Sequence, residues 1–178
     1  MPKQHEKKYL IIEGIKYRIY SRYQFKRKGI THHLIHELKY NNGKRIGKFF
    51  GDEIIPLIKD FNSVSHIIPV PLHWKKKKIR GYNQSEIIAV TISKKTSLRL
   101  NTSTLIRKKN LQSQTKKKRY NRFEGVENVF DINYKTELEN QHVILIDDVI
   151  TTGATITACV SALNKIKNIK ISIVCVAN

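Results

Sequence analysis

Acidic residues are scarce in this sequence. Its 178 residues include 14 Asp and Glu against 34 Lys and Arg, which gives a formal net charge of +20. A surplus of this size attracts polyanions such as nucleic acid, anionic lipid or phosphorylated small molecules. The chain is also rich in Lys, Ile and Asn, as an AT-biased genome would produce, and Lys greatly outnumbers Arg, the better reader of phosphates and bases. Two interpretations therefore stay open, a polyanion-binding surface and codon bias.

Long apolar runs and cysteines are scarce as well. No run approaches the ~20 apolar residues that span a bilayer, and the apolar stretch near the N-terminus is broken by Glu13 and Lys16, too soon for a signal peptide. The only cysteines, Cys159 and Cys175, lie in apolar surroundings and form no C-x-x-C pair. We therefore expect a cytoplasmic protein without membrane insertion, with two reduced core thiols instead of a disulfide or metal site.

No internal repeat and no linker rich in Pro, Gly or Ser divides the chain, so one domain is expected. Apolar patterning predicts a hairpin over residues 9–25, and Thr31 is a candidate N-cap for the first helix. Helices are predicted over residues 31–40, 44–59, 81–95 and 154–166, and strands over residues 66–72, 97–106, 142–148 and 169–176. Because strands alternate with helices and are continuous apolar runs, the pattern predicts an α/β fold with a mostly parallel sheet.

Two adjacent acids end one of these strands, in the segment VILIDDVITTGAT at residues 143–155. Neighbouring carboxylates repel each other and resist burial, so their position at the end of an apolar strand indicates a functional role. Ligands of parallel sheets bind beyond the carboxyl ends of the strands, which is where Asp147 and Asp148 are expected. The turn behind them offers backbone N–H groups, hydroxyls and a helix N-terminus, and these favour a phosphomonoester. The predicted phosphate-binding residues are Thr151, Thr152, Gly153, Ala154 and Thr155, with Gly153 allowing close approach of the backbone.

Asp147 and Asp148 cannot bind a phosphate without a metal, but they can accept hydrogen bonds from a vicinal diol. Acids on the 2′- and 3′-hydroxyls and the turn on the phosphate together suit a ribose 5-phosphate. The segment matches neither G-x-x-x-x-G-K-[ST] nor G-x-G-x-x-G, and its acids are not spaced D-x-D. The alternative is that the acids cap the following helix, although one cap needs only one acid.

VILIDDVITTGAT resembles the 13-residue signature with which type I phosphoribosyltransferases bind 5-phosphoribosyl 1-pyrophosphate (PRPP). Residues 67–89, IIPVPLHWKKKKIRGYNQSEIIA, and residues 34–54, LIHELKYNNGKRIGKFFGDEI, resemble the ComF family of competence-associated, phosphoribosyltransferase-like proteins. The similarity covers roughly residues 30–176. It implies a type I phosphoribosyltransferase fold, with a hood in residues 1–60 and a PRPP-binding core in residues 61–178. The four-cysteine zinc ribbon usual in the family is absent from this sequence, so no structural zinc is expected.

The resemblance also implies displacement of pyrophosphate from PRPP through an oxocarbenium-like transition state, which needs charge neutralisation and exclusion of water. Mg²⁺ is the expected cofactor, held through PRPP, with water-mediated contact to Asp147 or Asp148 and no direct protein ligand assigned. The resemblance assigns catalytic roles to Asp147, Asp148 and Arg80, and pyrophosphate binding to Leu72, His73 and Arg80. As alternatives, the prolines near Leu72 simply end a strand, and Asn83 or Gln84 caps a helix.

Two further groups of residues are candidates for the site. The basic stretch at residues 107–122 lacks apolar periodicity and corresponds to a flap that closes over PRPP, or it is an ordinary surface loop. Its predicted ligand contacts are Gln114, Thr115, Lys118 and Arg119. The pair His32 and His36 has i,i+4 spacing, but a metal site would need a third ligand.

Nothing in the sequence identifies the acceptor of the phosphoribosyl group. The amidophosphoribosyltransferase reaction would need an N-terminal cysteine nucleophile, which is absent from this sequence. Two hypotheses remain: a Mg²⁺-dependent phosphoribosyltransferase linked to DNA uptake, or a non-catalytic competence factor. The second would bind single-stranded DNA, and other competence proteins, with PRPP or a nucleotide as regulatory ligand. Basic runs at residues 75–78 and 116–119, with Trp74 and Tyr120 beside them, are the candidate DNA contacts.

Overall fold

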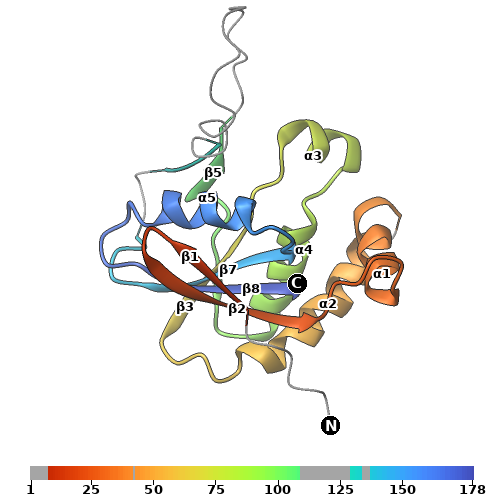
Figure 1. Cartoon of the computed structure of the whole chain (residues 1–178), viewed down its shortest axis with the longest axis horizontal. Coiled ribbons are helices and arrows are strands. Elements are labelled where there is room, and N and C mark those ends of the chain that lie inside the picture. The colour runs from red at the N-terminus through yellow and green to blue at the C-terminus, as the bar shows by residue number, and fades with distance from the viewer. Residues whose placement is uncertain (1–7, 42, 109–128, 134–136) are drawn as a thin grey trace, which may run out of the picture.

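The computed structural model describes residues 8–41, 43–108, 129–133 and 137–178. Its centre is a six-stranded sheet with the strand order β1-β2-β8-β7-β3-β4 (Figure 1). The strands are β1 Lys8–Ile12, β2 Ile15–Tyr23, β3 Val64–Pro69, β4 Arg99–Leu100, β7 His142–Val149 and β8 Lys170–Ala177. Only β1 pairs antiparallel with its neighbour, and every other adjacent pair is parallel. The predicted α/β fold with a mostly parallel sheet is confirmed.

Helices cover both faces of this sheet (Figure 1). They are α1 Ile30–Tyr40, α2 Gly43–Ile58, α3 Trp74–Arg80, α4 Gln84–Lys95 and α5 Ala154–Leu163. One core cluster joins α2 and α4 to one face of the sheet. The other joins α5 to the opposite face, together with a small antiparallel sheet of β5 Leu105–Arg107 and β6 Phe130–Ile132.

Strand β7 has a continuous apolar run in its sequence because both of its faces are buried. Its side chains alternate between the two faces, as in any strand. Val143 and Leu145 belong to the core cluster around α5, whereas Ile144 and Ile146 belong to the cluster around α2 and α4. Because both faces are covered, the residues between His142 and the acid pair are all apolar.

Helices α2 and α4 are joined by a close backbone contact. Gly43, Gly47 and Gly51 recur every four residues along α2, on the side that faces α4. A Cβ atom at Gly47 would lie 2.4 Å from Ile87, and one at Gly51 would lie 2.6 Å from Thr91. The glycines are therefore required for this helix pair to pack, a role that their spacing along an amphipathic helix did not reveal.

Three details of the predicted secondary structure are wrong. The strand expected over residues 97–106 is two strands in different sheets, because the Asn101 side chain accepts hydrogen bonds from the backbone N–H groups of Ser103 and Thr104 and turns the chain. The helix expected over residues 81–95 begins only at Gln84. Gly29, not Thr31, is the N-cap of α1, and it makes no side-chain cap bond.

The N-terminal residues expected to form a hood are divided between two places. The hairpin of β1 and β2, predicted from the sequence and confirmed, adds its second strand to the edge of the main sheet beside β8. Helix α2 packs against α4 in the core. Both cysteines are buried and free, as predicted. No helix among the described residues is long and apolar enough to cross a bilayer.

Candidate functional site

The acid pair lies at the carboxyl end of β7, where both side chains are buried. Asp147 and Asp148 are only 8% and 4% exposed. An Asp147 oxygen accepts a hydrogen bond from the Ser85 hydroxyl at 2.8 Å and another from the backbone N–H of Asp148 at 2.9 Å. Ser85 comes from the first turn of α4, so the packing of α4 on β7 holds this carboxyl group in place.

Asp148 is held by residues from two other parts of the chain. The Nζ of Lys39, on α1, lies 2.7 Å from Oδ2 of Asp148 and forms an ion pair with it. The Gln84 side chain donates to Oδ1 at 3.5 Å, and Arg80 in turn donates to the amide oxygen of Gln84. Arg80 therefore acts on the acid pair through Gln84 and not by direct contact.

The two acids differ in how they are neutralised. Burial raises the pKa of Asp147 well above the usual range of a carboxyl group, and the charge of Asp148 adds to this rise, while the hydrogen bond from Ser85 opposes it. Asp148 instead has the cation of Lys39 beside it. A buried pair of this kind presents oxygen acceptors to a ligand while carrying less than its full charge.

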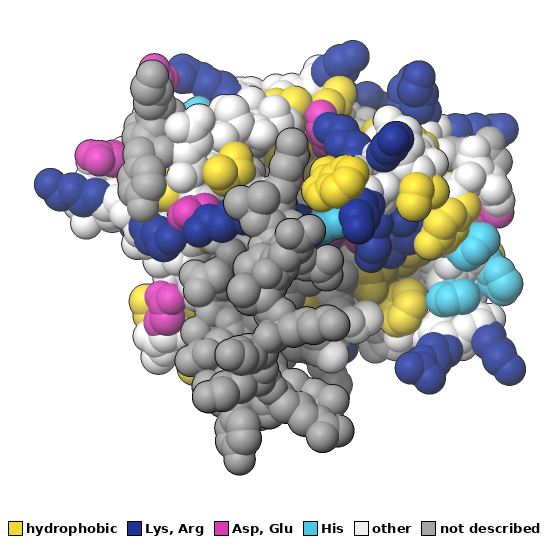
Figure 2. Space-filling view, turned by 90° about the horizontal axis from the view of Figure 1, so that it is seen from above, with side chains coloured by type: hydrophobic (Ala, Val, Ile, Leu, Met, Phe, Trp, Pro, Cys, Tyr) yellow, Lys and Arg dark blue, Asp and Glu magenta, His cyan; other side chains and the backbone are white. Residues whose placement is uncertain are grey.

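A cavity of about 550 Å³ opens over the acid pair. Helix α1 and the segment before it line one side through Phe25, His32, Ile35, His36, Lys39 and Tyr40. Thr151 and Thr155 line another part, and Leu72, Lys76 and Arg107 come from elsewhere in the chain. In the view from above, histidine side chains gather at the side on which Figure 1 places α1, and Lys and Arg side chains surround the described part of this face (Figure 2).

Arg107 is a half-buried cation in this cavity, and it forms no ion pair with a carboxylate among the described residues. Its guanidinium lies 5.1 Å from the ring centroid of Phe130, and its Nε is buried and has no hydrogen-bond partner in the described part of the chain. Burial lowers the pKa of Arg107. Because a partly buried cation without a counterion is costly, the arrangement favours an anionic ligand at this point.

The turn after β7 is exposed and leads into α5. Thr151, Thr152, Ala154 and Thr155 are all exposed, so their backbone N–H groups and hydroxyls are open to a ligand. Gly153 has a φ of +81° and caps α5, and a Cβ there would lie 2.6 Å from the side chain of Leu10 on β1. The glycine is thus required by its left-handed conformation and by packing of the hairpin, besides any role in phosphate approach.

Comparison with known proteins gives this site a family. The model of the phosphoribosyl transferase domain matches residues 72–178, more than half of the chain. This chain belongs to the phosphoribosyl transferase domain family. The match includes the acid pair, the turn into α5 and Arg107, so many of the residues that surround the cavity lie within the phosphoribosyl transferase domain.

Competence proteins are among the curated relatives. The chain is 32% identical to Competence protein F of Haemophilus influenzae over 101 residues, 56% of this chain and 44% of that protein. It is 36% identical to Competence protein ComFC of Bacillus subtilis over 120 residues, 61% and 47% of the two chains. These matches and the domain match confirm the resemblance to the ComF family.

Two weaker matches are found as well. The chain is 24% identical to the DNA utilization protein YhgH of Escherichia coli O6:H1 over 129 residues, 69% of this chain and 56% of that one. A solved structure described as the allosteric regulatory enzyme of purine biosynthesis matches with 17% identity and a TM-score of 0.48, over 71% of this chain and 25% of that one. This chain spans about half the length of the curated relatives that it matches.

Only some of the predicted site residues line the cavity among the residues that the structure describes. Asp147, Asp148 and Leu72 line the cavity. His73 is not among the described residues that line the cavity. It caps α3 instead, and its side chain accepts a hydrogen bond from the Lys75 N–H at 3.3 Å. The predicted flap contacts lie outside the described residues: Gln114, Thr115, Lys118 and Arg119.

Asn83 and Gln84 were each predicted either to cap a helix or to contact the ligand, and the structure gives them different positions. Asn83 is the cap of α4, accepting from the Ser85 N–H at 3.2 Å while its own amide donates to the Val70 carbonyl at 2.9 Å. Gln84 lines the cavity and contacts Asp148.

Sequence reasoning missed Lys39 and Arg107, which line the cavity, and Ser85, which holds Asp147 from α4. Only Arg107 left a signal, as a single cation directly after a short apolar strand. His32 and His36 both line the cavity. In the described parts of the chain, no three His, Cys, Asp or Glu side chains gather as metal ligands.

Proposed function

We propose that this protein binds PRPP together with Mg²⁺ in the cavity over the acid pair and transfers the 5-phosphoribosyl group to an acceptor. The observation that carries the proposal is the presence, in one cavity, of a buried acid pair and a partly buried guanidinium that has no counterion among the described residues. PRPP has a diol that can donate to the acid pair and a pyrophosphate that can pair with the guanidinium of Arg107. The reaction, the metal and the ligand are proposals that rest on this geometry and on the family match.

The ribose fits the acid pair through its hydroxyl groups. The 2′- and 3′-hydroxyls would donate to Asp147 and Asp148, and Ser85 and Gln84 would keep the carboxyl groups oriented. The 5-phosphate would lie at the exposed turn before α5, where exposed N–H groups and the helix dipole favour an anion. The buried end and the exposed end of the cavity thus suit the neutral and the charged part of the same sugar.

The pyrophosphate fits the cationic side of the cavity. Arg107 would pair with it, Lys76 lines the same cavity, and the backbone at Leu72 is close by. Charge that develops on the leaving pyrophosphate would be stabilised more strongly in this partly buried setting than in water. Arg80 would support the acid pair through Gln84 and act as a positioning residue.

The residues present also fit Mg²⁺ that is held mainly by the ligand. The cavity offers carboxylate oxygens, the donors that Mg²⁺ prefers, and Oδ2 of Asp148 is already paired with the Lys39 ammonium at 2.7 Å. With only two such side chains, most of its octahedral shell would come from phosphates and water. When bound, Mg²⁺ would neutralise charge on the pyrophosphate.

Helix α1 would supply the acceptor side of the cavity. His32, His36 and Tyr40 line it and provide polar and aromatic contacts, although they do not define one acceptor. The centroids of the His36 and Tyr40 rings lie 4.8 Å apart, so a planar acceptor would find an aromatic edge there. Release of pyrophosphate on addition of candidate acceptors tests the transfer reaction. Calorimetry with PRPP and Mg²⁺ tests binding alone.

A second candidate function is binding of single-stranded DNA, and helix α3 supports it. None of its seven residues is buried, it carries Lys75, Lys76, Lys77 and Lys78, and Trp74 is 46% exposed. Cations neutralise phosphates and an exposed indole can stack on a base. The names of the relatives, competence and DNA utilization proteins, point the same way. Fluorescence anisotropy with labelled oligonucleotides tests this function.

A further inference from the structure

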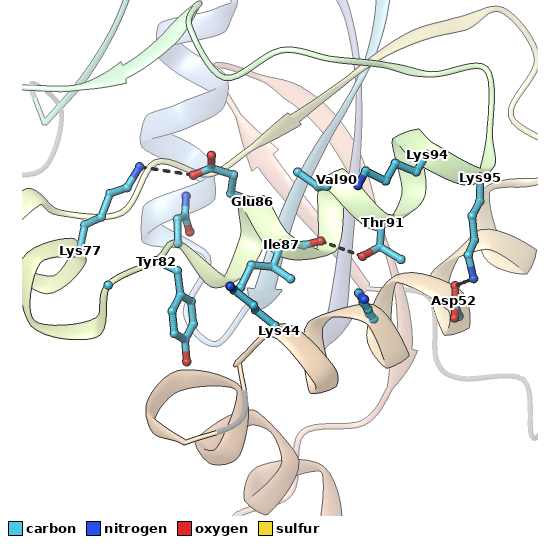
Figure 3. Close-up of a pocket in the computed structure, with 13 residues that line it drawn as sticks. Lys44, Asp52, Lys77, Tyr82, Glu86, Ile87, Val90, Thr91, Lys94 and Lys95 are labelled. Carbon is cyan, nitrogen blue, oxygen red and sulfur yellow. Dashed lines mark hydrogen bonds and ion pairs between the residues drawn. The ribbon is translucent and has the colours of Figure 1, made fainter.

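A second cavity of about 730 Å³ lies between α2 and α4 (Figure 3). Its floor includes Ile87 and Val90, three residues apart on α4 and both only half-buried. Lysines stand at both ends of this groove: Lys44 and Lys77 toward the start of α4, and Lys94 and Lys95 toward its end (Figure 3). We name the groove by these two helices, the α2–α4 groove.

The charge of the α2–α4 groove is only partly balanced. Lys77 pairs with Glu86 at 3.5 Å, and Lys95 pairs with Asp52. Lys44, Lys48 and Lys94 also line the groove, and none of them has a carboxylate within 4.0 Å in the part of the chain that the structure describes. Three lysines that have no carboxylate partner among the described residues thus surround an apolar strip.

The groove is preformed by the packing of its two helices. Gly47 and Gly51 of α2 pack directly against α4 side chains, so the helices cannot approach further, and Tyr82 closes one end. The Tyr82 hydroxyl donates to the Leu38 carbonyl at 2.8 Å and its ring covers Gly43. A ligand would therefore meet a surface that needs little rearrangement.

The lining favours a peptide over a nucleic acid strand. The one aromatic ring among its described lining residues, Tyr82, is engaged with α1 and α2, so stacking on bases has no platform there. Asp52 and Glu86 would also lie beside a continuous phosphate backbone. An amphipathic helix with apolar side chains at i,i+3 spacing and acids on both flanks would place its apolar face on Ile87 and Val90 and its acids against the lysines.

We propose that the α2–α4 groove docks an acidic amphipathic segment of a partner protein. The groove lies on the outward side of α4, whereas Ser85 and Gln84 on the same helix contact the acid pair. The docking site is therefore separate from the cavity of the proposed transfer reaction.

The test uses a fluorescent helical peptide of about 15 residues, with leucines at i,i+3,i+4,i+7 and flanking glutamates. We expect the variant with Lys44→Glu, Lys48→Glu and Lys94→Glu to bind this peptide about tenfold more weakly or worse. The matched control carries Lys26→Glu, Lys167→Glu and Lys170→Glu, which change the net charge equally at exposed sites outside the groove. Val90→Ser should weaken binding about threefold without any change in charge.

Localisation by amide chemical shifts completes the test. Titration of the labelled full chain with the peptide should shift the signals of Ile87, Val90 and Lys94 and leave those of Lys75 and Lys78, which do not line the groove, in place. Equal loss of affinity in the groove variant and its matched control would overturn the proposal, as would shifts confined to Lys75 and Lys78. A loss of oligonucleotide binding but not of peptide binding in the groove variant would assign the groove to nucleic acid instead.

Discussion

The two strand ends that border the cavity are built in opposite ways. At the end of β7, Asp147 and Asp148 are buried and are contacted by Ser85, Gln84 and Lys39. Beyond the end of β3, helix α3 has no buried residue and its lysines extend into solvent. The first arrangement gives fixed geometry and the second gives charge without fixed geometry. Affinity that depends on the acid pair should therefore be specific, and affinity that depends on α3 should be sensitive to salt.

The largest effect is expected from replacing both carboxyl groups of the acid pair. Asp147→Asn with Asp148→Asn should weaken PRPP binding by at least ~2 kcal/mol, because two hydrogen bonds to carboxyl acceptors are degraded. Calorimetry in the presence of Mg²⁺ measures the loss, and Asp60→Asn, at an exposed position, is the matched control. Wild-type affinity in a correctly folded double variant would remove the diol from the proposed binding mode.

A somewhat smaller effect is expected at Arg107, and it should depend on the ligand. Arg107→Gln should weaken PRPP binding by about 1.5 kcal/mol, since a charge-assisted hydrogen bond to pyrophosphate is removed. Binding of ribose 5-phosphate, which has no pyrophosphate, should change little. Calorimetry with the two ligands compares them directly. An equal loss of affinity for both would show that Arg107 supports the fold of the cavity and not the pyrophosphate.

The raised pKa of Asp147 predicts that the ligand-free protein becomes less stable as pH rises. The folded state holds the proton more tightly than the unfolded state, so this group's contribution to stability is present at low pH and is lost as pH rises through the raised pKa. Asp147→Asn cannot ionise and should escape this loss. Its melting temperature relative to wild type should therefore rise by about 2–4 °C between acidic and alkaline pH, which corresponds to ~1 kcal/mol.

Differential scanning fluorimetry from about pH 5 to pH 9 measures this difference, again with Asp60→Asn as control. A melting-temperature difference that stays constant across this pH range would mean that ionisation of Asp147 does not destabilise the folded protein. The amide oxygen of the variant accepts the hydrogen bond from Ser85 less strongly than a carboxylate oxygen does, which lowers stability at every pH, so only the slope, not the offset, tests the prediction.

The smallest effect is expected on the α3 side. Lys75→Ala with Lys78→Ala should reduce the salt dependence of single-stranded DNA binding by about 0.7 in log affinity per log salt for each phosphate that is no longer neutralised. Trp74→Ala should cost about 1 kcal/mol because base stacking on the indole, which is exposed in the structure, is removed. Anisotropy measures both. Absence of DNA binding by the wild type at about 50 mM salt would attribute the surplus charge to codon bias.

Several features of the fold could be predicted because their signals are local. The apolar run of β7, the adjacent acids and the turn to Gly153 are contiguous, so composition and spacing alone placed them at the end of a buried strand. The strand expected over residues 97–106 failed for a local reason too, because apolar content was weighed above the Asn101 side chain, which accepts hydrogen bonds from the backbone and ends β4. The boundary between α3 and α4 was missed at Gly81, whose φ of +82° separates them.

The contacts of the acid pair could not be predicted in the same way. Ser85 is 62 residues from Asp147 in the chain, and Lys39 comes from a helix near the opposite end of the sequence. Whether a lysine is a solvated side chain or the partner of a buried carboxylate depends on which helix packs over the strand end. The same holds for the glycines of α2, whose need for close packing exists only because α4 lies against them.

The sequence by itself determined the type of sheet, the position of the acids at a strand end and the turn to Gly153 behind them, because each depends on residues that are neighbours in the chain. Only the tertiary structure decided that Arg107 is partly buried beside Phe130, that Lys39 neutralises Asp148 and that an apolar groove lies among lysines. Burial and charge pairing are properties of the whole packed molecule, since they depend on how much water the surrounding elements exclude.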